Sequence, residues 1–69
     1  MSNTEHLVKM ANQIESFFRS AVGRNVAVEN ISGHIKRFWD PRMRKEIISH
    51  VHSGGQGLGE LSLEAIKFL

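Results

Sequence analysis

The chain has 69 residues, a formal net charge of +2 and no cysteine. A chain of this length builds one small domain, so we expect no large pocket. The missing cysteine excludes disulfides, thiolate metal ligands, iron–sulfur clusters and a cysteine nucleophile. The net charge is low for a nucleic-acid-binding chain of this size, so the distribution of the charges is more informative than their sum.

Apolar residues in the first third of the chain are spaced as on one face of a helix: Leu7, Met10, Ala11, Ile14, Phe17, Phe18 and Ala21. This spacing predicts a helix over residues 3–22, with Gly23 as its stop. Ser2 and Glu5 have the spacing of a capping box. Charged residues interrupt the apolar ones throughout this helix, which excludes a signal peptide or a membrane span. We therefore expect a cytoplasmic protein without membrane contact.

A second helix is predicted over residues 25–39, capped by Asn25. Its apolar positions follow in steps of three and four: Val28, Ile31, Ile35 and Phe38. Asp40 and Pro41 then end this helix and begin another. The residue before proline avoids the α conformation, aspartate is a strong N-cap, and proline fits the first helical position. The chain is expected to bend sharply at this corner.

The third helix is predicted over residues 41–52, and Gly54 and Gly55 end it. A flexible glycine-rich connector over 54–59 leads to a short helix over 62–68, capped by Ser62. Nothing in the sequence indicates a strand. The predicted fold class is all-α, a small bundle of three main helices plus a short C-terminal helix in a single domain.

Two motifs resemble ligand sites only superficially. His50 and His52 are two positions apart on a helix and so do not share a face, and a zinc site needs more ligands than they supply. The glycine connector lacks the preceding strand that a phosphate-binding loop requires. Spacing suggests no Ser/His/Asp grouping and no carboxylate pair, so we predict no catalytic residue, no metal site and no cofactor.

Positive charge gathers in one stretch, where five of the nine Lys and Arg lie: Lys36, Arg37, Arg42, Arg44 and Lys45. The first two lie at a predicted helix C-terminus, where the helix dipole favours cations. Arg42 and Arg44 lie in the first turns of the predicted third helix, where the helix dipole destabilises a cation by roughly 0.3–1 kcal/mol. We hypothesise that they contact an acidic or carbonyl-rich surface of a partner. The alternative is a set of solvated charges, with Arg42 paired to Glu46.

The same stretch holds the only tryptophan, Trp39, directly after Phe38. Neighbouring helical side chains point about 100° apart, so a small core does not readily cover both rings. Tryptophan flanked by arginine is typical of interface anchors, and burial in the core is the alternative.

Three segments of the chain are informative when taken together: residues 9–14, Phe17-Phe18 and the block His34-Ile35-Lys36-Arg37-Phe38-Trp39-Asp40-Pro41-Arg42-Met43-Arg44. They resemble the delta subunit of bacterial NAD-dependent formate dehydrogenase. The block is the specific part of the resemblance, which covers about residues 4–52 and extends more loosely through Leu58.

The resemblance implies an accessory subunit without a cofactor of its own. In that family the large catalytic subunit carries the molybdenum or tungsten pterin site and iron–sulfur clusters, other subunits carry FMN and the NAD site, and the delta chain is associated with assembly or stability of the complex. The implied partner is the large catalytic subunit. The expected partner-binding residues are Lys36, Arg37, Trp39, Asp40, Pro41, Arg42, Arg44 and Lys45.

Two other functions remain as alternatives. The second helix, the tight corner and the basic third helix loosely resemble a helix-turn-helix, in which Arg42, Arg44, Lys45 and Ser49 would face a nucleic-acid groove. The low net charge and the missing glycine in the turn argue against this alternative. The second of these alternatives is self-association through the apolar stripe of the first helix.

Overall fold

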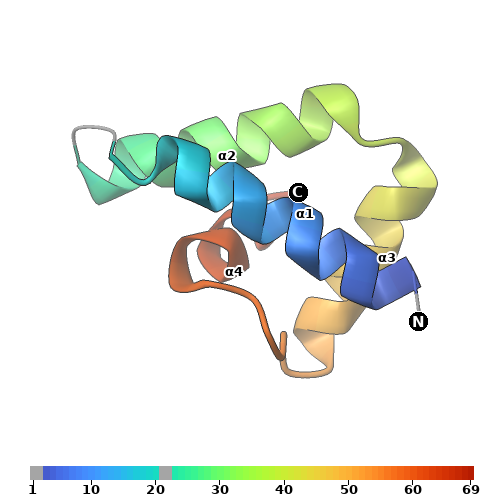
Figure 1. Cartoon of the computed structure of the whole chain (residues 1–69). Helices are drawn as coiled ribbons and strands as arrows, with labels where there is room; N and C mark the ends of the chain where they lie inside the picture. Colours follow the sequence, from blue (N-terminus) through green and yellow to red (C-terminus); the bar gives the residue numbers. More distant parts are fainter. Residues whose placement is uncertain (1–2, 21–22) are drawn as a thin grey trace.

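The computed structural model describes residues 3–20 and 23–69, and within them it contains helices and no strand (Figure 1). The helices are α1 (Asn3–Phe18), α2 (Arg24–Phe38), α3 (Pro41–His52) and α4 (Glu60–Ile66). The predicted fold class, three main helices and a short C-terminal one, is confirmed. None of the described helices is long and apolar enough to cross a lipid bilayer.

The first two helices form an antiparallel pair, and α3 turns away from them at the far end of α2 (Figure 1). The short α4 packs against α2 most extensively, and also against α1 and α3. Because α1 also contacts both α2 and α3, every other helix is packed against it.

The core lies where these helices meet, and its largest fully buried aliphatic side chains are isoleucines: Ile31, Ile35, Ile47 and Ile66. Leu7 and Ala11 are the buried residues that α1 contributes. Burying one large aliphatic side chain is worth about 1.5–3 kcal/mol, so these few residues supply much of the driving force for folding. The predicted stripe of α1 is thus only partly used in the core.

The junction between α1 and α2 differs from the prediction. Helix α1 ends at Phe18, four residues before the predicted end, while residues 21–22 and the predicted cap Ser2 lie outside the described residues. Gly23 is the N-cap of α2 instead of the stop of α1, and the prediction of Asn25 as the cap was wrong. The Gly23 carbonyl accepts a hydrogen bond from Ala27 at 3.2 Å, so α2 begins earlier. At its φ of 91°, a residue with a side chain would be strained.

The corner between α2 and α3 forms as predicted. Trp39 is extended, with φ −91° and ψ 137°, and its amide donates to the Ile35 carbonyl at 2.9 Å, which ends α2. The Asp40 side chain accepts a hydrogen bond from the Met43 amide at 2.9 Å, and Pro41 is the first residue of α3. An N-cap aspartate and a proline at the first helical position together start the helix at one defined residue.

The start of α4 also differs from the prediction. The helix begins at Glu60, with Gly59 as its N-cap, so Ser62 is inside the first turn and the prediction of Ser62 as the cap was wrong. The Ser62 hydroxyl is buried and donates to the Ala11 carbonyl at 3.1 Å. The Ser62 amide donates instead to the Glu15 carboxylate at 2.8 Å. A side chain of α1 therefore caps the first turn of α4.

The connector before α4 is held in place at several points, which corrects the prediction of a flexible segment. Asn12 of α1 donates to the Gly57 carbonyl at 2.9 Å and accepts from the Gly59 amide at 2.8 Å. A side chain at Gly59 would collide with the Glu15 carboxylate, so a larger residue there would displace this carboxylate from the Ser62 amide. His50 Nε2 lies 2.8 Å from the Gln56 carbonyl, and because a carbonyl oxygen only accepts, the ring must carry its hydrogen on Nε2.

Replacing Asp40 with alanine removes the N-cap of α3. We expect the free energy of unfolding to fall by about 1 kcal/mol, measured by urea denaturation. Asp40→Asn keeps an accepting oxygen and serves as the matched control, with most of the stability retained. Equal stabilities for Asp40→Ala and the wild type would contradict the role of the cap.

Replacing Glu15 with alanine leaves the Ser62 amide without its carboxylate acceptor. Because this hydrogen bond involves a charged acceptor, we expect a loss of about 1.5–3 kcal/mol of stability, and faster amide hydrogen exchange in α4. Ser16→Ala, an exposed change on the same helix, is the control. Unchanged exchange in α4 of Glu15→Ala would show that the carboxylate does not hold this helix.

Candidate protein-binding surface

An open groove of about 500 Å³ runs along α1 and α2 and reaches Trp39 at the corner and Met43 of α3. Its lining is apolar and aromatic, apart from Gln13 and His34. The lining residues are Met10, Gln13, Ile14, Phe17, Phe18, His34, Phe38, Trp39 and Met43. We call this feature the aromatic groove. It contains neither a carboxylate nor a lysine or arginine side chain.

Four rings of the aromatic groove follow one another from α1 to α2. Phe17 and Phe18 meet edge to face with centroids 5.0 Å apart, Phe18 lies 6.2 Å from the His34 ring, and His34 lies 4.6 Å from Phe38. Aromatic pairs in this distance range attract one another beyond the effect of area burial. The contacts therefore bring the rings of the two helices together as one surface.

The two rings at the ends of this series are open to solvent. Phe17 is 76% exposed and Phe38 is 69% exposed. Single exposed apolar side chains are ordinary, but large ones that gather around a groove are typical of binding sites. The groove is therefore the apolar surface of this molecule best suited to a partner.

Trp39 lies inside the corner and not on its surface. Only 4% of this residue is exposed, and it belongs to the hydrophobic core while also lining the aromatic groove. Of the two adjacent rings, Phe38 is the one that faces solvent. Any contribution of Trp39 to partner binding is therefore that of a support beneath the corner.

Arg44 makes a hydrogen bond within the chain, beside any contact with the partner surface that is hypothesised for it from the sequence. Its Nη1 donates to the Lys36 carbonyl at 2.8 Å. This carbonyl is in the last turn of α2, where backbone acceptors lack helical partners. From its position on α3, Arg44 thus gives a hydrogen-bond donor to a carbonyl at the end of α2. This bond holds the two helices together at the corner.

Arg42 is solvent-exposed and is not paired with Glu46, whose carboxylate accepts instead from the Thr4 hydroxyl at 2.9 Å. The ion pairs found in residues 3–20 and 23–69 join Arg24 to Glu60 at 3.1 Å and to Glu64 at 3.6 Å. The charge of Arg42 is therefore not neutralised within the described part of the chain.

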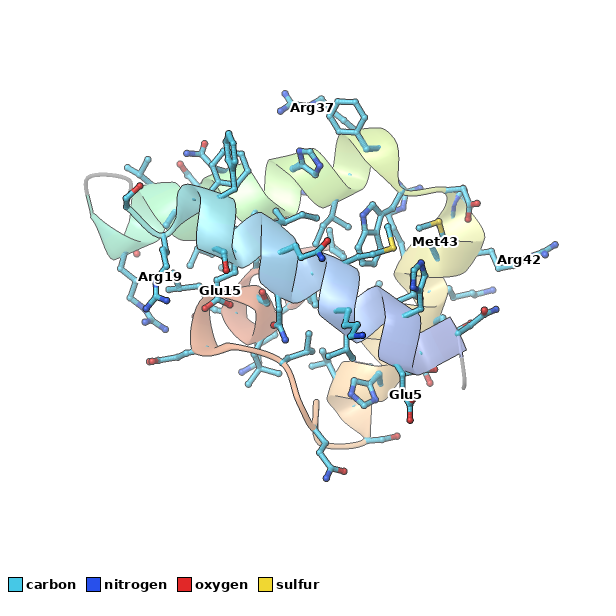
Figure 2. The ribbon with its side chains drawn as sticks, viewed as in Figure 1. Glu5, Glu15, Arg19, Arg37, Arg42 and Met43 are labelled. Atoms are coloured by element: carbon cyan, nitrogen blue, oxygen red, sulfur yellow. The ribbon has the colours of Figure 1, made fainter. Side chains whose placement is uncertain are left out.

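The basic residues do not all face one depression. Lys36 lines a groove between α2 and α4 together with Arg24 and Glu64. Arg42, Arg44 and Lys45 border a shallow hollow with Pro41 and Ile48. Arg37 projects outward from the end of α2 and Arg42 from the start of α3, in different directions (Figure 2). The structure therefore places Arg37 and Arg42 on two sides of the corner and Lys36 on a separate face.

No group of three or more His, Cys, Asp and Glu that could hold a metal ion occurs among residues 3–20 and 23–69. His52 is exposed at the end of α3, while His50 contacts the connector. The two histidines do not converge on one site.

The sequence carried a signal for the aromatic groove in its adjacent aromatic pairs. Phe17-Phe18 and Phe38-Trp39 each place two rings about 100° apart on a helix, so one ring of each pair turns away from the core. Sequence reasoning selected Trp39 and missed Phe17 as a surface residue. In the one pair of unequal size, Phe38-Trp39, the larger ring is the buried one.

The fold and its surfaces define a small all-α bundle with an aromatic groove beside a basic corner. The family model for the NADH-dependent formate dehydrogenase delta subunit FdsD matches residues 6–66, and the chain belongs to this family. Searches of curated protein sequences and of solved structures found no match. The family match includes all four helices, except the first residues of α1.

The two arginines of α3 should respond differently to neutral substitution. Arg44→Met removes the bond to the Lys36 carbonyl, and we expect a loss of about 1 kcal/mol in the free energy of unfolding. Arg42→Met, which removes no internal contact, should stay within about 0.5 kcal/mol of the wild type. Urea denaturation of both variants measures these free energies. A larger loss of stability in Arg42→Met than in Arg44→Met would contradict the structural role of Arg44.

Proposed function

We propose that this chain is a noncatalytic accessory subunit that binds the large catalytic subunit of a molybdenum- or tungsten-dependent formate dehydrogenase complex in the cytoplasm. Binding supports the assembly or stability of the complex. The proposal of a formate dehydrogenase complex rests on membership of the delta subunit family. The observation that supports the binding mode is the exposed corner, where Arg42 and Lys45 have no ion-pair partner within the described residues.

The corner suits recognition because its backbone is fixed. The Asp40 cap, Pro41 and the bond from Arg44 hold the ends of α2 and α3 together. An arginine presented by such a rigid element loses less conformational freedom on binding than one on a loose segment. The guanidinium of Arg42 can form paired hydrogen bonds with a carboxylate or backbone carbonyls of the partner.

A binding subunit needs no chemistry to support an enzyme. A chain that binds only the folded catalytic subunit stabilises it by mass action, and the stabilisation grows with the ratio of free chain to dissociation constant. At a hundredfold excess over that constant the gain is about 2.7 kcal/mol. Such a gain is a large fraction of the stability of an ordinary domain.

Reversing the charge of Arg42 and Lys45 together, by Arg42→Glu and Lys45→Glu, should abolish recovery of the catalytic subunit with a tagged chain from cells that co-express the complex. The new carboxylates would repel the acidic or carbonyl-rich surface that the arginine contacts. Circular dichroism should remain helical, because both side chains are exposed and neither makes a side-chain hydrogen bond or ion pair within residues 3–20 and 23–69.

The matched control reverses Arg19 and Lys67, two exposed cations away from the corner, and changes the net charge by the same amount. It should recover the catalytic subunit as the wild type does. Equal recovery by the Arg42 and Lys45 double variant would remove the corner from the binding surface.

A further inference from the structure

We propose that the aromatic groove binds an amphipathic helix of the catalytic subunit, with apolar side chains in the groove and carboxylates at the end nearest Arg37 and Arg42. This inference rests on the proposed function, since it takes the catalytic subunit as the partner. It adds the aromatic groove as a second binding element beside the charged corner, and assigns the chemistry of the segment that occupies it.

The shape of the aromatic groove fits a helix. On α1 its lining residues follow one face, from Met10 to Phe18, over about 12 Å at the helical rise of 1.5 Å per residue. On α2, His34 and Phe38 lie one turn apart and form the opposite wall. A channel between two neighbouring helices is the surface into which a third helix packs its side chains. About two turns of a partner helix fill this length.

The exposed rings supply the apolar contact. Phe17 on α1 and Phe38 on α2 stand at the two ends of the ring series, and both are more than two-thirds exposed. Covering them requires apolar side chains of the partner at helical spacing, three or four residues apart. Large aromatic side chains at the centre of an interface usually carry most of its binding energy.

The charge around the groove selects an acidic partner. Glu15 and Asp40 adjoin lining residues in sequence, but Glu15 accepts from the Ser62 amide and Asp40 from the Met43 amide. Arg37 and Arg42 adjoin Phe38 and Met43, are exposed, and have no carboxylate partner within the described residues. The corner beside the groove, residues 36–45, holds five Lys and Arg against the single carboxylate of Asp40, and carboxylates on the occupant complement this excess of positive charge.

The same charges disfavour a second copy of this chain as the occupant. A twofold interface places the same patch on both subunits. Two copies joined through the aromatic groove would bring the cations of both corners to one interface, without carboxylates of the groove lining to offset them. A different chain with acidic residues avoids this repulsion.

Photocrosslinking in the assembled complex tests the identity of the occupant. p-Benzoylphenylalanine replaces Phe17 in the tagged chain, which is co-expressed with the other subunits, and the crosslinked peptides are identified by mass spectrometry. We expect a catalytic-subunit peptide with apolar residues at helical spacing and nearby aspartate or glutamate. Crosslinks only to another copy of this chain, or to a catalytic-subunit peptide without this pattern, would overturn the inference, as would no crosslink to protein.

The same probe at Phe68 is the matched control, because that ring is 63% exposed but lines the groove between α2 and α4. It should not capture the peptide found from Phe17. Capture of the same peptide from both positions would show that the peptide is not bound specifically in the aromatic groove, and would overturn the inference.

A paired substitution measures the contribution of the groove. Phe17→Ser with Phe38→Ser should weaken binding of the catalytic subunit tenfold or more, because two large rings lose their contact. Val26→Ser with Phe68→Ser removes exposed apolar side chains elsewhere and should bind as the wild type. Full binding by the groove variant would overturn the inference. If the groove variant loses its helical circular dichroism, the photocrosslinking result decides.

The two proposals fail in different ways. If the wild-type chain does not recover the catalytic subunit, the proposed function fails. If the wild type recovers it and the groove variant recovers it equally, the proposed function stands and the groove inference fails.

Discussion

The cap that Asp40 forms on α3 is the interaction on which the binding surface depends. It starts α3 at Pro41 directly after α2 has ended, and the resulting corner turns Trp39 into the core and leaves Phe38 outside. Arg44 then reaches back to the Lys36 carbonyl and joins the two helix ends. One short local motif therefore fixes the corner at which Trp39 is buried and Phe38 is exposed.

Interactions between neighbours in sequence were predictable, and interactions between distant residues were not. The bounds of α3 and its cap follow from Asp40-Pro41, because proline and aspartate act on the adjoining backbone. The start of α4 could not be predicted, because its cap comes from Glu15, 47 residues away from Ser62. The same holds for Arg44, whose partner is a backbone carbonyl that only the folded corner brings near.

The sequence also did not predict which aromatic residues are buried in the core and which are exposed. Periodicity placed Phe17 and Phe38 on helices and predicted that a small core does not readily cover both Phe38 and Trp39, but it did not decide which ring of each adjacent pair turns outward. That choice depends on the volume available between α1, α2 and α3. Trp39 fills the space at the corner. The exposed aromatic surface therefore consists of Phe38 and, across the groove, Phe17.

Family membership, a rigid cationic corner and an open aromatic groove are together consistent with a subunit that acts by binding. The most direct test is a titration of the purified chain into the purified catalytic subunit, followed by sedimentation velocity. A saturable complex of one chain per catalytic subunit is the expected result. Two species that sediment independently, even at tens of micromolar of each component, would contradict the proposed function.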